Sequence, residues 1–272
     1  MVGAAAKREA SRMLIEGFKV SKRRSCRIVR LSSATLHYCP KERGDGPIKE
    51  RMKVLAERFR RYGCPRIHYF LKKEKLVVNY KRTERIYREL GLQLGKRRRG
   101  KKMASVIRIP RPKAQAPNEV WSMDFLFDAL ICGRRLKIMP VVDDFTKQCV
   151  TILVSRSISG KNIVDHFNTL SIKPKRIRCD NGPEFQSNAL LHWADPAGIE
   201  IEFIDPGKPI QNAYIESFNG RIRDECLNDN VFLNVDDAQK KISDWIEEYH
   251  SIRPHSSLGM KTSNEFAEAW AR

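Results

Sequence analysis

The stretch Ile204–Asn228, IDPGKPIQNAYIESFNGRIRDECLN, holds the acidic residue around which the rest of the chain can be arranged. Pro209 suits the first turn of a helix, and apolar residues follow at roughly helical spacing: Tyr214, Ile215, Phe218, Ile222 and Leu227. On that helix Glu216 shares or adjoins a face with four polar or small residues: Asn212, Asn219, Gly220 and Arg223. This face suits a carboxylate that holds a metal ion beside phosphate groups, although a solitary acid would more simply be a solvated surface residue.

The charge of the chain is strongly basic and unevenly distributed. The 272 residues carry a formal net charge of +20. Residues 1–113 hold 34 Lys and Arg against 9 Asp and Glu, whereas residues 114–272 hold 18 against 23. A basic front half joined to a slightly acidic back half predicts a region that binds nucleic acid, followed by a domain with a different function. The sequence has no long apolar run and no secretory signal, so a membrane partner is not expected.

The front half is predicted to contain two helix-turn-helix-like units, at residues 1–45 and 46–95. In the first unit, Ser32 or Ser33 can cap a short helix, and Arg23, Arg24 and Arg27 are candidates for phosphate contacts. In the second unit, the helix Lys81–Leu90 is the candidate recognition helix, with Lys81, Arg82 and Arg85 facing DNA. A pair of ordinary charged surface helices remains the alternative for both units.

A basic, proline-containing linker at residues 96–117 precedes a catalytic core at residues 118–272. Three apolar segments predict an antiparallel meander: Val120–Leu130, Leu136–Phe145 and Gln148–Ser155. Two more strands are expected at Arg176–Asp180 and Ile199–Ile204, with helices at Asn162–Leu170 and Glu184–Trp193. The predicted fold is therefore α/β, a ribonuclease H-like mixed sheet of five strands with flanking helices. Pro196 is expected to end the helix before the last strand.

Two further acids are candidates to join Glu216. Asp124 lies in the first predicted strand and Asp180 ends the fourth, so that the two can converge if these strands are neighbours. Clustered carboxylates repel one another unless a cation lies between them. Oxygen ligands favour Mg²⁺ or Mn²⁺, and a pair of such ions is the arrangement used for in-line phosphoryl transfer. Three other acids compete for this role: Asp128, Asp143 and Asp144.

Several strings of residues together resemble one known family. They are WSMDFLFD (121–128), VVDDFTK (141–147), RCDNGPEF (178–185), the stretch after Asp205 and YHSIRPHSSLG (249–259), with YGCPRIHYFLKKE (62–74) and YRELGL (87–92) in the front half. The chain resembles the OrfB-type transposases of two-frame insertion sequences (insertion sequence family three), which are relatives of retroviral integrases. Thirty-five residues separate Asp180 from Glu216, as in the family's acidic signature.

The resemblance implies a metal-dependent DNA transposase that cuts the ends of its element and joins them to target DNA. It implies that Asp124, Asp180 and Glu216 hold Mg²⁺ or Mn²⁺, two ions in all. Because the string around Asp124 matches the family better, the competing acids Asp128, Asp143 and Asp144 are interpreted as turn or supporting residues. Lys208, Asn212, Asn219 and Arg223 are expected to position DNA near them. The expected partners are DNA, an upstream OrfA-type protein or its frameshift fusion, and a second copy on DNA, in a cytoplasmic, nucleoid-associated location.

Two other functions remain open at this stage. A ribonuclease H-fold nuclease would cut DNA without joining it, and a catalytically inert regulator would only bind DNA. The C-terminal residues Arg253 and His255 have two interpretations as well: they contact DNA, or they belong to a segment that packs on the core.

Overall fold

The computed structural model of the chain describes residues 3–38, 44–95, 113–205 and 209–271. These residues form two compact units that divide between Lys49 and Glu50. The limits predicted for the four sequence segments stay predictions, and most of the predicted linker lies outside the described residues. None of the described helices is both long and apolar enough to cross a membrane.

Among its described residues, the smaller unit contains three complete helices and the start of α4: the complete ones are α1 (Ala4–Phe18), α2 (Lys22–Ile28) and α3 (Ser33–His37). The predicted cap is confirmed, because the Ser32 hydroxyl accepts a hydrogen bond from the Thr35 N–H at 3.1 Å. Helix α1 begins at Ala4, since the run Ala4–Ala6 has high helix propensity. Arg23, Arg24 and Arg27 are exposed on α2.

Three further helices precede the sheet: α4 (Gly46–Arg58), α5 (Cys64–Lys73) and α6 (Tyr80–Glu89). Helix α5 starts after Gly63 with a proline in its first turn, where the missing N–H costs nothing. Asn79 caps α6 by accepting the Lys81 N–H at 2.9 Å. The predicted recognition helix therefore forms, one residue earlier at each end than expected.

The sheet has six strands: β1 (Val120–Met123), β2 (Leu126–Ala129), β3 (Arg135–Asp143), β4 (Cys149–Ser155), β5 (Arg176–Cys179) and β6 (Glu200–Phe203). β1 and β2 both lie antiparallel along one side of β3, and β4 lies along its other side. β5 continues the sheet parallel to β1, and β6 pairs parallel with β5. The mixed sheet with flanking helices is confirmed, but the single strand predicted over residues 120–130 is wrong. It is broken at Asp124 and Phe125, where the Asp124 carboxylate accepts the Phe125 N–H at 2.8 Å and competes with the ladder.

Five helices follow the first four strands: α7 (Gly160–Asn168), α8 (Asn188–Ala194), α9 (Ala213–Glu225), α10 (Val235–Ser251) and α11 (Ser263–Ala271). Helix α8 starts four residues later than predicted, because Ser187 caps it after a turn over residues 182–187. It ends at Ala194, two residues before Pro196, as expected. Helix α9 follows the turn η1 (Pro209–Asn212), so the helix predicted to open at Pro209 begins as a 3₁₀ turn.

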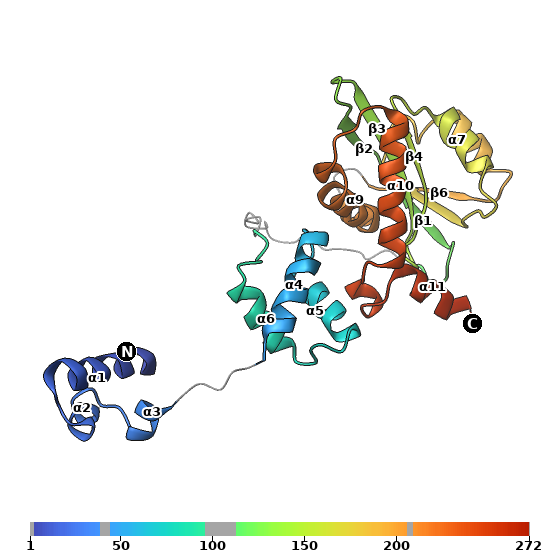
Figure 1. Cartoon of the computed structure of the whole chain (residues 1–272). Coiled ribbons are helices and arrows are strands. Elements are labelled where there is room, and N and C mark those ends of the chain that lie inside the picture. Colours follow the sequence, from blue (N-terminus) through green and yellow to red (C-terminus); the bar gives the residue numbers. More distant parts are fainter. Residues whose placement is uncertain (1–2, 39–43, 96–112, 206–208, 272) are drawn as a thin grey trace. The chain divides into compact units, whose positions relative to one another are not determined.

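Helices α9 and α10 lie on one side of the sheet and α7 on the other (Figure 1), and each side has its own cluster of buried apolar residues. Alternate residues of β3 separate them: Leu136 and Ile138 pack with α9 and α10, whereas Met139 and Val141 pack with α7 and α8. The same alternation places Trp121 and Met123 of β1 with α7 and α8. Ser122 and the position of Asp124 therefore belong to the face that α9 covers.

Candidate active site

The strand register places Asp124 and Asp180 side by side. In the parallel pair β1–β5, Val120 is opposite Arg176 and Ser122 is opposite Arg178. Asp124 and Asp180 directly follow these strands with the same offset, at the same end of the sheet. Neighbouring strands lie about 4.8 Å apart, so the two aspartates begin from adjacent backbone positions.

Helix α9 brings Glu216 toward the same end through two amide side chains. Asn212, one turn before Glu216, donates a hydrogen bond from Nδ2 to the Met123 carbonyl at 3.3 Å. Asn219, one turn after it, donates from Nδ2 to Oδ2 of Asp124 at 3.0 Å. Residues at i−4 and i+3 lie on the same face as residue i, so the face that bears Glu216 is directed at the break between β1 and β2.

The loop after β5 holds the Asp180 carboxylate with a hydrogen bond from its own backbone. The Gly182 N–H donates to Oδ1 of Asp180 at 3.0 Å. A Cβ added at Gly182 would lie 3.0 Å from the same oxygen, so the absence of a side chain lets the loop close around the carboxylate. Phe185 and Gln186 donate their N–H groups back to the Gly182 carbonyl, each at 3.0 Å, and complete the turn.

The electrostatics of the site agree with three carboxylates that share one region. Burial is the largest influence on Asp124 and raises its pKa to about 6. The charges of Asp180 and Glu216 also raise this pKa, while hydrogen bonds from Phe125 and Asn219 lower it. Burial raises the pKa of Glu216 as well. Within the described part of the chain, no ion pair neutralises any of the three acids.

The carboxylate oxygens of Asp124, Asp180 and Glu216 are of the kind that bind a hard divalent cation, but the three side chains do not converge into a set of metal ligands. Among the described residues, no three His, Cys, Asp or Glu side chains form a group that could hold a metal ion. Each carboxylate keeps acceptor positions beyond its local hydrogen bonds. The buried Oδ1 atoms of Asn212 and Asn219 likewise have no donor among the residues that the structure describes. Oxygen-only ligands of this kind fit Mg²⁺ or Mn²⁺ in chemistry.

A buried ion-pair network lies on the sheet face that α9 covers, two residues before Asp124 and Asp180 along β1 and β5. Ser122 donates to Oδ1 of Asp144 at 2.7 Å, and Arg178 donates to Oδ2 of Asp144 at 2.9 Å and to Glu202 at 3.0 Å. Burial raises the pKa of Asp144 to about 6 against the lowering effects of Ser122 and Arg178. Ser122 and Arg178 each stand two residues before a candidate acid, so the network braces β1 against β5. The sequence interpretation assigned Asp144 a supporting role but missed Arg178, the buried one of the two arginines in β5.

The residues predicted to contact DNA have different surroundings. Asn212 and Asn219 are buried. Arg223 donates to the Phe127 carbonyl at 2.6 Å and pairs with Asp128 at 3.4 Å. These three side chains hold β1, the strand break and β2 against α9, and their DNA contacts stay predictions. Lys208 lies outside the described residues.

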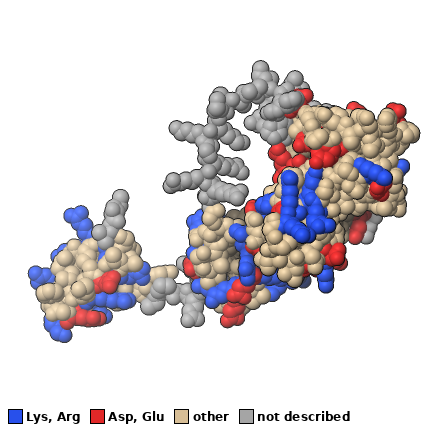
Figure 2. Space-filling model, turned by 90° about the horizontal axis from the view of Figure 1, so that it is seen from above, with Lys and Arg blue, Asp and Glu red and all other residues tan. Residues whose placement is uncertain are grey.

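The predicted recognition helix presents its basic residues to different degrees. Lys81 is exposed, whereas Arg82 and Arg85 are half-buried and Arg85 pairs with Glu89 at 2.6 Å. On the face visible in Figure 2, Lys and Arg patches of the larger unit lie beside Asp and Glu patches, so the positive charge there is not one continuous stripe. The phosphate contacts assigned to both helical units stay predictions.

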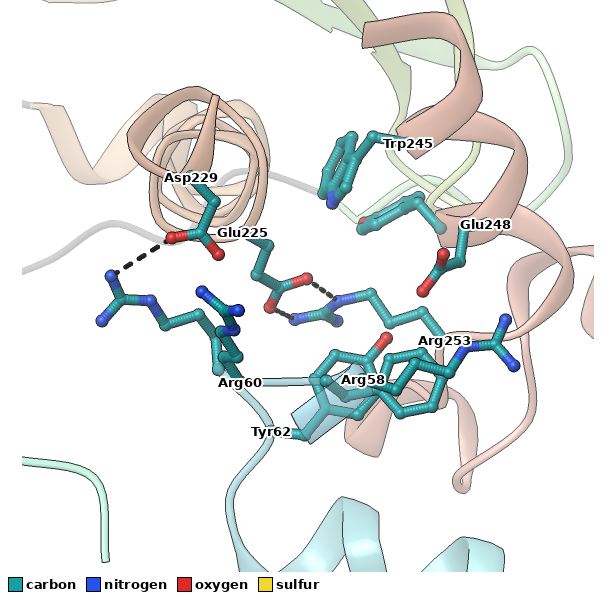
Figure 3. Close-up of a pocket in the computed structure, with 11 residues that line it drawn as sticks. Arg58, Arg60, Tyr62, Glu225, Asp229, Trp245, Glu248 and Arg253 are labelled. Carbon is teal, nitrogen blue, oxygen red and sulfur yellow. Dashed lines mark hydrogen bonds and ion pairs between the residues drawn. The ribbon is translucent and has the colours of Figure 1, made fainter. Parts of the chain in front are cut away.

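The C-terminal segment packs on the protein instead of presenting Arg253 to solvent. Arg253 is 1% exposed and donates two hydrogen bonds to Glu225, at 2.8 and 2.7 Å. Its guanidinium also lies over the rings of Tyr62 and Tyr249. A cavity of about 140 Å³ opens beside this pair (Figure 3). None of the three candidate acids lines this cavity. The burial of Arg253 and its pairing with Glu225 favour the interpretation that the C-terminal segment packs on the core.

Comparison with known proteins agrees with this arrangement. Models of an HTH-like domain and of two integrase core domains match residues 43–101, 114–209 and 197–262. The 31.7 kDa protein of insertion element IS407 from Burkholderia multivorans is 44% identical over 256 residues, 93% of this chain and 92% of that relative. The chain belongs to the integrase-core transposase family of insertion elements. DNA is the partner of such a transposase.

Two more relatives extend the match. The transposase is 43% identical to the 39.2 kDa protein of IS476 from Xanthomonas euvesicatoria, over 96% of this chain and 76% of that one. It is 28% identical to the transposase of IS904 from Lactococcus lactis, over 80% and 92%. A simian T-cell lymphotropic virus intasome chain, solved in complex with a PP2A regulatory subunit, aligns with a TM-score of 0.53 at 16% identity, over 80% of this chain and 74% of that chain. This likeness confirms the predicted ribonuclease H-like fold.

Proposed function

We propose that the transposase cuts the ends of its insertion element and joins them to target DNA at a site formed by Asp124, Asp180 and Glu216. The observation that supports this most directly is the shared register of Asp124 and Asp180 beside the face of α9 that bears Glu216. Asp180 and Glu216 lie near enough for their charges to raise the pKa of Asp124, and no cationic partner among the described residues offsets this repulsion. A divalent cation offsets that repulsion.

Each side chain has a distinct task in this proposal. Asp124, Asp180 and Glu216 would hold Mg²⁺ or Mn²⁺, two ions in all, through carboxylate oxygens. The bound ions would activate the attacking oxygen and stabilise the leaving oxygen of an in-line displacement. Asn219 keeps the Asp124 carboxylate directed at the site, and the Gly182 N–H does the same for Asp180. The same carboxylates would serve both cutting and joining, since neither step needs a covalent protein intermediate.

The basic helices would hold the DNA that this site acts on. We assign phosphate contacts to Arg23, Arg24 and Arg27 of α2, to Lys81, Arg82 and Arg85 of α6, and to Lys208, Asn212, Asn219 and Arg223 near the acids. We further expect an OrfA-type partner or a frameshift fusion with it, a dimer or larger assembly on DNA, and a cytoplasmic location at the nucleoid. Two element ends must be processed together, which is the reason to expect more than one copy.

The proposal is tested with single isosteric substitutions of the three acids. Asp124→Asn, Asp180→Asn and Glu216→Gln should each abolish joined products when the protein is incubated with Mg²⁺ and labelled element-end DNA. Their DNA affinity should stay close to wild type, because no phosphate contact is removed. Asp165→Asn, an exposed acid on α7, is the matched control and should keep full activity.

Two results would contradict the proposal, each in a different way. Cut DNA without any joined product in the wild-type protein would identify a nuclease instead. Unchanged transposition in all three acid variants would show that the cluster has no part in the reaction, and would leave a DNA-binding role.

A further inference from the structure

A buried lysine joins three segments beneath the candidate site. Lys137 of β3 is 7% exposed and lies on the sheet face covered by α7 and α8, opposite the face of α9. Its Nζ pairs with Glu184 and donates to the Ile158 carbonyl at 3.3 Å. The same Nζ lies 3.7 Å from the centroid of the Phe125 ring, a close cation–π contact. A lysine at a strand position between apolar neighbours needs such partners, because an unpaired buried charge is strongly unfavourable.

The partners of Lys137 are the chain neighbours of two candidate metal ligands. Phe125 directly follows Asp124 in the strand break, and Glu184 lies in the loop that begins at Asp180. Phe185, next to Glu184, stacks on Phe125 with 4.6 Å between ring centroids and 7° between ring planes. The lysine and the stacked rings therefore connect the Asp124 segment with the Asp180 loop on the side away from α9.

The fit of the loop under this connection is close. A Cβ added at Gly160, the first residue of α7, would lie 1.8 Å from Oγ of Ser187 and 3.0 Å from the Glu184 carbonyl. Helix α7 therefore presses directly on the segment that carries Glu184. The hydrogen bond from Lys137 is the largest influence that lowers the pKa of Glu184, so its carboxylate remains charged in the pair.

We infer that Lys137 and Glu184 are positioning residues that set the separation of Asp124 and Asp180, and thereby the affinity of the site for its divalent cations. Among the described residues, no hydrogen bond or ion pair joins either residue to Asp124 or Asp180: Lys137 acts through Phe125 and Glu184 acts through its own loop. The inference rests on the proposed function, because it needs the two aspartates to be metal ligands. An ion pair that merely stabilised the sheet would change unfolding without changing cation affinity.

The test compares Lys137→Met, Glu184→Gln and the double variant with the wild-type full chain. Mn²⁺ binding is measured by calorimetry, and amide hydrogen exchange is measured over residues 180–187. Each single variant should bind Mn²⁺ about 10- to 100-fold more weakly, the effect typical of residues that orient metal ligands. Exchange at the Gly182 amide should become faster. Because the two residues act as one unit, the double variant should bind no more weakly than the worse single variant.

Glu200→Gln is the matched control. It breaks the Arg176–Glu200 ion pair, at 2.8 Å, near the opposite end of β5 from Asp180. Its Mn²⁺ affinity should equal that of wild type. Glu184→Gln removes the charge of Glu184 but keeps an amide oxygen that can accept the hydrogen bond from Lys137, so it provides a folded variant even where Lys137→Met does not fold.

Wild-type Mn²⁺ affinity in Glu184→Gln, together with unchanged exchange over residues 180–187, would overturn the inference. An equal loss of affinity in Glu200→Gln would overturn it too, since it would mean a general loss of stability. Asp124→Asn and Asp180→Asn separate this result from the proposed function. If these variants also bind Mn²⁺ with wild-type affinity, the assignment of the metal site to these aspartates is wrong, and the proposed function fails along with the positioning role.

Discussion

The pair Glu225–Arg253 allows a quantitative prediction about stability. Glu225→Leu removes the carboxylate that accepts two hydrogen bonds from Arg253. Arg253 is 1% exposed, so water cannot replace the lost carboxylate as a hydrogen-bond partner unless the guanidinium moves. The rings of Tyr62 and Tyr249 lie beneath it and offer only cation–π contacts.

The expected cost follows from this burial. Removing one partner of a buried ion pair destabilises a protein by about 3–5 kcal/mol, because the other charge stays buried and unpaired. For a unit of this size such a loss lowers the melting temperature by roughly 10 °C. Replacing both residues, as in Glu225→Leu with Arg253→Met, should restore most of the stability, since apolar side chains of similar volume substitute well for a buried pair.

The assay is urea unfolding of the full chain followed by tryptophan fluorescence, for which Trp245 beside the cavity is a local probe. Asp229→Asn is the control: it breaks the exposed pair with Arg61, at 3.6 Å, and should cost less than about 1 kcal/mol. A Glu225→Leu variant as stable as this control would refute the reasoning. So would a double variant as unstable as the single one.

Three further predictions concern acid sensitivity, packing and DNA affinity. His250 accepts the Cys149 N–H at 2.9 Å, and burial lowers its pKa to about 4. The neutral His250 therefore contributes its full share to the unfolding free energy above the unfolded pKa near 6.5, and this share is lost as the pH falls toward 4. His250→Asn should reduce the loss of unfolding free energy in acid by up to about 3 kcal/mol, whereas His192→Asn, at an exposed position, should leave that loss unchanged. Gly160→Ala should destabilise the protein by about 1–3 kcal/mol through its clash with Ser187, whereas Gly220→Ala, with open space around it in α9, should stabilise it by about 1 kcal/mol; thermal unfolding of both variants shows whether the signs are opposite. Lys81→Gln should reduce the slope of log affinity for DNA against log salt concentration by about one, whereas Lys161→Gln on α7 should leave this slope unchanged. Equal slopes for the two variants would show that Lys81 does not contact DNA phosphates.

Local patterns were enough to predict most of the elements. Apolar runs rich in Val and Ile marked the strands, helical spacing marked α9, and a serine marked the start of α3. The break at Asp124 was not predicted, because its cause is one hydrogen bond between a carboxylate and the next N–H. The late start of α8 was missed for a similar reason, since the turn that delays it depends on how Gly182 folds back on Asp180.

The sequence alone was sufficient to select the fold class and the basic front half, since charge and periodicity are properties of the order of residues. Spacing, together with the resemblance to a known family, selected the three candidate acids. Only the tertiary structure decided that Arg253 is buried against Glu225, that Asn212 and Asn219 hold the strand break, and that Lys137 lies beneath Asp124 and Asp180. These roles come from contacts between residues far apart along the chain. Which distant side chain neutralises a buried charge depends on the register of the strands and the packing of the helices, and neither leaves a mark in the local sequence.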